Sequence, residues 1–124
     1  MTLNFDEPLP EIAPSFWYVA TPYSKYPGGM EEAFKQACIA AAEMLRLQIP
    51  LFCPIAHTHS IAMEGKLERA NHDFWLPADQ PMIDAAGGII VVEMENWQES
   101  VGVLYEIKEF KEAGKPVRFL EWPV

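Results

Sequence analysis

Glu106 is the residue of this sequence whose type and position most favour chemistry. It follows Ser100 and Gly102 in a segment that comes after the most apolar run of the chain, Gly88–Glu93. A buried apolar run followed by a turn and a helical pattern predicts a parallel strand leading into a helix, whose N-terminal N–H groups can bind an anion. Because residues four apart share a helix face, Gly102 and Glu106 would face the same space. A carboxylate in such a partly dry cleft could attack an electrophilic carbon.

Both polar residues of this segment also have a simpler interpretation. Glu106 fits a solvated helix face beside Lys108 and Glu109, because carboxylates with a perturbed pKa are a minority. Ser100 is a preferred N-cap residue, and capping alone would explain it. The same helix N-terminus could in addition accept a phosphate or a sugar hydroxyl.

Asp79 is a second candidate, between Pro77 and Pro81. If one cleft holds Asp79 and Glu106, one carboxyl group could donate a proton while the other acts as nucleophile, the division of roles used on glycosidic bonds. The alternative is that Asp79 only complements the dipole of a helix that begins nearby.

The histidines and two aromatic residues suggest binding rather than a metal. His57 and His59 have only His72 nearby as a third ligand, and alternate residues of an extended segment point to opposite faces. We therefore expect no metal and no cofactor, and assign His57 to hydrogen bonding with substrate or to loop capping. Tyr23 and Trp97 could stack on a planar base, or could belong to the edge of the core.

Four short strands alternating with helices must position these residues. We expect strands at 16–20, 50–54, 88–94 and 116–120, and helices at 30–48, 81–86 and 100–113. Residues 55–60 are expected to form a polar loop, and residues 61–76 to include one irregular helical segment. Pro77 and Pro81 are expected to break any continuous helix, which puts Pro81 at the first position of the short one.

Apolar spacing predicts which faces of the two long helices are buried. The inward residues are expected to be Phe34, Ala37, Cys38, Ala41 and Leu45 in the first, and Val103, Leu104, Ile107 and Phe110 in the last.

The element order predicts an α/β fold of three layers, α/β/α, with a flavodoxin-like parallel sheet of four to five strands in the order 2-1-3-4. The switch point then lies between the first and third strands, so the loops after Ala20 and Met94 face each other. Residues 1–14, with three prolines, are expected to form an extended arm that wraps the domain or a partner chain, and residues 15–124 a single domain.

Composition limits the possible partners. With 124 residues, nine Lys and Arg and a formal net charge of −9, the chain lacks the basic surface that a nucleic-acid polymer or an anionic membrane requires. The two cysteines, Cys38 and Cys53, fall in a helical and a strand pattern and are expected to be reduced and buried. No signal peptide or spanning segment is evident, so we expect a cytoplasmic protein.

The run Ser100-x-Gly102-Val103-x-Tyr105-Glu106 is similar to the nucleophile motif of the 2′-deoxynucleoside 5′-phosphate N-hydrolases and the nucleoside 2-deoxyribosyltransferases. The resemblance extends over most of residues 16–120 and is strongest to a small bacterial and phage branch of these enzymes. Tyr18 matches the tyrosine of that family's first strand, and Asp79 precedes the third strand by the family's usual interval. Ser24 stands where the hydrolases carry an arginine.

This resemblance implies cleavage of the N-glycosidic bond of a nucleoside or nucleoside 5′-monophosphate. Glu106 would attack C1′ of the sugar, Asp79 would assist the departing base, and Tyr18 would hydrogen-bond near the nucleophile. Water as acceptor gives a hydrolase and a second base gives a transferase. Ser100 would hold the 5′ end together with Ser24 and Lys25.

Two further expectations concern assembly and the competing function. The resemblance implies a homodimer or higher homo-oligomer, since this family tends to form dimers with shared sites. The alternative to an enzyme is a non-catalytic nucleotide-binding module of the same fold.

Overall fold

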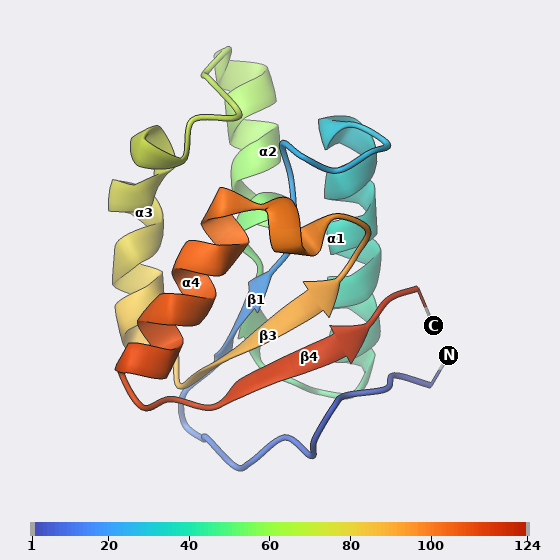
Figure 1. Cartoon of the computed structure of the whole chain (residues 1–124), viewed down its shortest axis with the longest axis vertical. Coiled ribbons are helices and arrows are strands. Elements are labelled where there is room, and N and C mark those ends of the chain that lie inside the picture. The colour runs from blue at the N-terminus through green and yellow to red at the C-terminus, as the bar shows by residue number, and fades with distance from the viewer. Residues whose placement is uncertain (1, 124) are drawn as a thin grey trace.

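The computed structural model describes residues 2–123, which form an α/β fold with a four-stranded parallel sheet (Figure 1). The strand order is β2-β1-β3-β4, which confirms the predicted fold class and topology. In chain order the elements are β1 (Trp17–Ala20), α1 (Met30–Arg46), β2 (Leu51–Phe52), α2 (Pro54–Gly65), α3 (His72–Ala85), β3 (Gly88–Glu93), the 3₁₀ helix η1 (Trp97–Glu99), α4 (Val101–Glu112) and β4 (Val117–Glu121).

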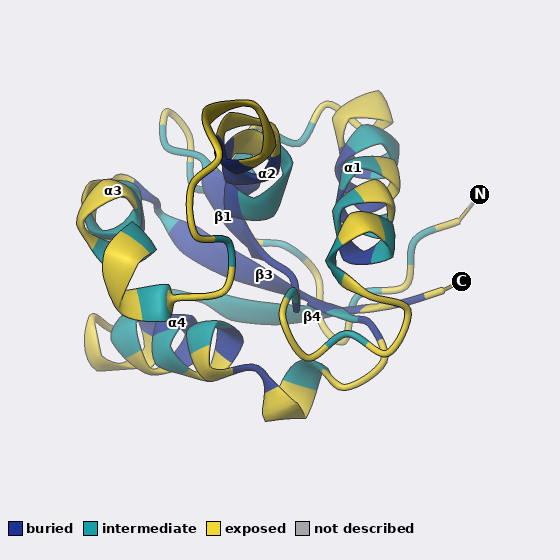
Figure 2. Cartoon of the chain, turned by 90° about the horizontal axis from the view of Figure 1, so that it is seen from above, coloured by how far each residue is buried: buried dark blue, intermediate teal, exposed yellow. Residues whose placement is uncertain are grey.

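Helices cover both faces of the sheet and give the three layers (Figure 2). Successive side chains of a strand point to opposite faces, so Val19 packs in the core cluster beneath α1 while Tyr18 packs in the cluster beneath α3 and α4. The central strands β1 and β3 are almost wholly buried. This rigid centre carries Tyr18 toward α4 and ends at the loop that begins with Thr21.

Helix α2 occupies the segment that was expected to be a polar loop, and that prediction is wrong. Pro54 stands in its first turn, where the fixed φ of proline suits a helix start. The Thr58 hydroxyl donates to the Pro54 carbonyl at 2.9 Å. Thr58 and His59 are buried although they are polar. Contacts of these buried polar side chains stabilise the helix. The polarity of residues 55–60 was therefore not evidence of a loop.

Helix α3 runs continuously through Pro77 and Pro81, so the predicted short helix over 81–86 is also wrong. Both prolines are exposed and lie four residues apart, which places them on one solvent-facing stripe. Water can bind the carbonyls that lose an intrahelical partner on that stripe. The Asn71 side chain caps the helix by accepting a hydrogen bond from the Asp73 N–H at 3.1 Å.

The inward faces of two helices differ in detail from those predicted. Leu45 of α1 and Leu104 of α4 are exposed rather than buried, at 54% and 47%. The short side chains of α1 allow it to lie close to the sheet, and its buried residues are Ala33, Ala37, Ala40, Ala41 and Met44. The edge strand β2 is only two residues long, shorter than the predicted 50–54.

The N-terminal arm lies along the outer edge of β4. Phe5 forms an antiparallel bridge with Leu120, and the Asp6 N–H donates to the Phe119 carbonyl at 2.9 Å. Phe5 also packs against the hydrophobic cluster beneath α1, as do Leu3, Leu9 and Ile12. The arm therefore wraps its own domain, which is one of the two expectations for it.

Two smaller observations complete the fold. Both cysteines are free thiols; Cys53 is buried, as expected, but Cys38 is only half-buried. Across residues 2–123, the structure contains no helix of the length and apolarity that a membrane span requires.

Candidate active site

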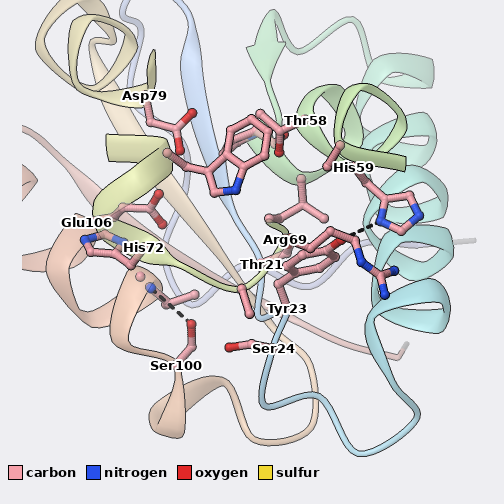
Figure 3. A pocket seen from close by; sticks show the side chains of 17 residues that line it. Thr21, Tyr23, Ser24, Thr58, His59, Arg69, His72, Asp79, Ser100 and Glu106 are labelled. Carbon is pink, nitrogen blue, oxygen red and sulfur yellow. Dashed lines mark hydrogen bonds between the residues drawn. The ribbon is translucent and has the colours of Figure 1, made fainter. Parts of the chain in front are cut away.

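A pocket of about 680 Å³, counting its open mouth, lies beyond the carboxyl ends of the central strands (Figure 3). Ligands of open α/β sheets bind at this edge, next to the switch point of the strand order. The loop after β1, the connection between α2 and α3, and helices α2, α3 and α4 supply the residues that line it. Figure 3 shows three polar groups of residues around it: Asp79 and Glu106 on the left, Tyr23, His59 and Arg69 on the right, and Ser24 and Ser100 below.

Glu106 and Tyr18 form a buried hydrogen-bonded pair at this pocket. Glu106 faces the pocket from the second turn of α4 and is 8% exposed, while Tyr18 is fully buried in β1. The Tyr18 hydroxyl donates to Oε2 of Glu106. Burial raises the pKa of Glu106 to about 8; the Tyr18 hydrogen bond opposes this rise and the nearby charge of Asp79 adds to it. Burial and the Glu106 charge raise the pKa of Tyr18, so its hydroxyl keeps its proton.

Asp79 lines the same wall from the middle of α3. Burial raises its pKa to about 6, and the charges of His72 and His57 oppose the rise. His72, at the start of α3, also lines the pocket and lies beside Gly102: a Cβ added to Gly102 would be 3.6 Å from Nδ1 of His72. The structure thus places two carboxyl groups with raised pKa values at one pocket.

The hydroxyl-bearing residues meet at the N-terminus of α4. Ser100 is the N-cap, and its hydroxyl accepts a hydrogen bond from the Val103 N–H at 3.2 Å. Thr21, Ser24 and Gly102 line the same part of the pocket. The Thr21 hydroxyl is buried and has no hydrogen-bond partner among residues 2–123. A buried polar atom without a partner carries a desolvation cost, so this corner is suited to a ligand group that can hydrogen-bond to it.

Tyr23 belongs to a second, partly buried hydrogen-bonded group on the opposite wall. Its hydroxyl lies 2.6 Å from Nδ1 of His59, and Nε2 of His59 lies 3.0 Å from a carboxylate oxygen of Glu31. Burial raises the pKa of Tyr23, and the neighbouring Arg69 guanidinium opposes that rise.

Three residues that the sequence nominated for substrate binding do not line the pocket. Lys25 is exposed, and the Trp97 ring packs against Phe119 with 5.5 Å between centroids. His57 is exposed and packs against Phe52. The helical geometry of α2 explains this last difference, because residues two apart in a helix point to nearly opposite sides and His59 takes the inward one.

Several lining residues were not nominated from the sequence. Thr21 directly follows the predicted strand at 16–20, and His59 was a candidate only for metal binding. Arg69, His72 and Trp75 lie in residues 61–76, for which only an irregular helical segment is predicted. Within residues 2–123 no group of three or more His, Cys, Asp or Glu side chains is arranged to hold a metal ion.

Comparison with known proteins gives a family without a described activity. A family described as a domain of unknown function, DUF1937, matches residues 15–122. No curated protein matches the chain. Neither finding links it to the N-hydrolases or deoxyribosyltransferases, so that resemblance rests on the motifs alone.

Proposed function

The chain belongs to the DUF1937 family, and we propose that it cleaves or transfers the N-glycosidic bond of a nucleoside or nucleoside 5′-monophosphate. The observation that carries the proposal is the buried Glu106 carboxyl group, hydrogen-bonded to Tyr18 and sharing its pocket wall with Asp79.

In the first step, a Glu106 oxygen attacks C1′ of the sugar as the bond from C1′ to the base nitrogen breaks. Asp79 donates its proton to the departing base, which leaves as the neutral molecule. The Tyr18 hydroxyl holds the other Glu106 oxygen, so the attacking carboxylate has one orientation. The product is a glycosyl ester on Glu106.

In the second step, water attacks C1′ and gives its proton to the Asp79 carboxylate. The ester bond breaks, Glu106 leaves as a carboxylate, and the free sugar is released. A second base in place of water gives a transferase by the same sequence of events.

The raised pKa values set the pH at which this pair is competent. With values of about 6 for Asp79 and about 8 for Glu106, the two carboxyl groups together hold one proton between these limits. These values put the proton mainly on Glu106, so the reactive form, with the proton on Asp79 and an ionised Glu106, is the minor one of the two singly protonated forms; its population is still highest between the two pKa values. We expect kcat/KM to be highest between about pH 6 and pH 8 and to fall on both sides.

The corner at the N-terminus of α4 suits the 5′ end of the substrate. The N–H groups of the first turn and the unpartnered Thr21 hydroxyl are donors aimed at one region, with Ser24 beside them. A phosphate or a 5′ hydroxyl would satisfy them.

The proposal also covers the substrate class, the cellular location and the oligomeric state that the sequence implies. A net charge of −9 supports a small-molecule substrate over a nucleic-acid polymer, because a polyanion would be repelled. The cytoplasmic location and the homodimer or higher homo-oligomer remain part of the proposal.

The test is base release from a panel of ribo- and deoxyribonucleosides and their 5′-monophosphates, followed by chromatography. We expect at least one member to release free base, and Glu106→Gln to abolish release while Glu112→Gln, on the exposed side of the same helix, leaves it unchanged. Asp79→Asn should slow release, whereas Asp84→Asn, exposed on α3, should not.

The same panel separates the enzyme from the non-catalytic binding module. The raised pKa of Glu106 is the observation that favours the module, because it opposes the ionised state that a nucleophile needs. Binding of a nucleotide without release of base at any pH between 5 and 9 would establish the module. Release that is equally fast in Glu106→Gln would refute the proposed nucleophile.

A further inference from the structure

The hydrogen-bonded chain Glu31–His59–Tyr23 has no part in the mechanism above, although its hydroxyl end lines the pocket. It joins three elements: Glu31 from the first turn of α1, His59 from α2 and Tyr23 from the loop after β1. Figure 3 shows Tyr23 and His59 linked on the wall opposite Asp79 and Glu106.

The His59 ring is held in one orientation. It is 4% exposed, and it stacks on Phe34 with ring centroids 4.3 Å apart and an interplanar angle of 20°. Both of its nitrogens have partners, Tyr23 at Nδ1 and Glu31 at Nε2. A ring flip would put Cδ2 and Cε1 where Nδ1 and Nε2 now lie and break both hydrogen bonds.

The carboxylate determines which way the hydrogen bonds run. A carboxylate only accepts hydrogen bonds, so Nε2 of His59 carries the proton that points at Glu31. When the imidazole is neutral, Nδ1 is the acceptor and the Tyr23 hydroxyl donates its only proton to it. In that state the Tyr23 oxygen offers a molecule in the pocket an acceptor and no donor.

Arg69 places donors beside this acceptor. Its guanidinium lies close enough to Tyr23 to counter the rise in the tyrosine pKa, and it lines the same wall. Arginine carries five N–H donors and no acceptor. This wall of the pocket thus offers the Arg69 guanidinium as a donor next to the Tyr23 oxygen as an acceptor.

We propose that Tyr23 and Arg69 recognise the edge of the substrate's base, and that His59 and Glu31 are positioning residues that fix Tyr23 as the acceptor. The inference deepens the proposed function and rests on it. The complementary ligand carries a ring acceptor next to an N–H donor, which is the pattern on the hydrogen-bonding edge of adenine and cytosine. Trp75 also lines the pocket, and an aromatic ring can stack on a planar base.

The probes are matched nucleotides whose bases either carry or lack the N–H donor that would bind the Tyr23 oxygen. Purine keeps the ring acceptor N1 of adenine, and 2-pyrimidinone keeps the ring acceptor N3 of cytosine, but each lacks the exocyclic amino donor. We would measure affinity by calorimetry, and base release in parallel, for 5′-monophosphates of all four bases. The proteins are the wild type, Tyr23→Phe, Glu31→Gln and Glu64→Gln; Glu64 is an exposed control on α2.

The wild type is expected to bind at least one natural base about tenfold or more tightly than its donor-free analogue, because the analogue leaves the Tyr23 oxygen unpaired. Tyr23→Phe should reduce this ratio to within about threefold of one. Glu31→Gln should reduce it partially, since an amide can donate as well as accept and no longer fixes the His59 tautomer. Glu64→Gln should keep the ratio of the wild type. Glu31 is largely solvent-accessible, so its variant is expected to fold.

The outcomes separate this inference from the proposed function. Binding with the expected ratios but without base release supports recognition and refutes the enzyme. Base release with no preference for the donor, or with the same preference in Tyr23→Phe, refutes recognition and leaves the enzyme standing. An unchanged ratio in Glu31→Gln refutes the positioning role of the chain, and failure to bind any of the nucleotides refutes both proposals.

Discussion

Glu106 is a carboxyl group in surroundings that oppose its charge. It is buried in the second turn of α4, and the Tyr18 hydroxyl is its hydrogen-bond donor. Burial and the neighbouring Asp79 both oppose ionisation and bring its pKa to about 8. A glutamate that only helped to fold the protein would be better replaced by an uncharged residue, so this position is one where stability and function are expected to conflict.

Glu106→Gln should stabilise the protein in a pH-dependent way. The pKa of Glu106 rises from 4.5 in the unfolded chain to about 8 in the fold, so the folded state binds the proton more tightly and the contribution of this group to stability falls as pH rises above 4.5. Gln does not titrate. At pH 8 we expect the variant to have a free energy of unfolding higher by roughly 2–4 kcal/mol, and at pH 4.5 a difference near zero.

Urea unfolding at the two pH values measures this difference. Glu112→Gln, on the exposed side of α4, is the matched control and should change the free energy of unfolding by less than about 0.5 kcal/mol at either pH. A Glu106→Gln protein that is less stable than the wild type at pH 8 would show that the charged carboxylate is favourable in the fold.

At the scale of single elements, the N-terminus of α4 combines a structural and a binding task. Ser100 caps the helix, which is worth about 1 kcal/mol. Gly102, in the first turn, leaves its side of the pocket open between Ser100 and His72. A glycine in a helix is less favourable than alanine by up to about 1 kcal/mol, so its presence here suggests that space matters more than helix stability.

Gly102→Ala is therefore expected to keep or raise the melting temperature while weakening ligand binding. The new Cβ would lie 3.6 Å from Nδ1 of His72 and 4.0 Å from the Ser100 hydroxyl, which are ordinary contacts. The methyl group nevertheless enters the pocket, and we expect a loss of at least about tenfold in nucleotide affinity, measured by calorimetry. Gly65→Ala, at the exposed end of α2, should stabilise similarly and leave affinity unchanged. Equal affinity in Gly102→Ala and the wild type would mean that no ligand approaches this turn.

The elements also show where sequence reasoning succeeds. The strand of Gly88–Glu93 and the helix after Ser100 were predictable because apolar runs, a cap residue and 3.6-residue spacing all favour the same structure. Helix α2 was not, because its polar residue His59 is buried through partners distant in sequence. The pocket residues that escaped prediction are mostly of this kind: Arg69 and His72 reach the pocket through the arrangement of α2 and α3, which no local pattern reveals.

Over the whole molecule, the strand order follows from the alternation of strands and helices, and it places the loop after β1 opposite the loop after β3. The pocket takes its lining from these loops and from α2, α3 and α4, while β4 and the N-terminal arm contribute none of the residues that line it. The arm instead covers the edge of β4 with backbone hydrogen bonds. An uncovered edge strand is a site for pairing with other chains, so the arm serves stability and solubility at a distance from the candidate chemistry.

Phe5→Ala tests whether the N-terminal arm affects stability without affecting the pocket. Phe5 forms the bridge to Leu120 and packs partly buried against the core cluster beneath α1, so its truncation should lower the free energy of unfolding by about 1–3 kcal/mol. Nucleotide affinity at a temperature well below the unfolding transition should stay within about twofold of the wild type, because the pocket residues keep their positions. Glu7→Ala, exposed in the same arm, should change neither quantity. Chemical denaturation and calorimetry on the three proteins measure both effects, and a large loss of affinity in Phe5→Ala would show that the arm is coupled to the pocket through the sheet.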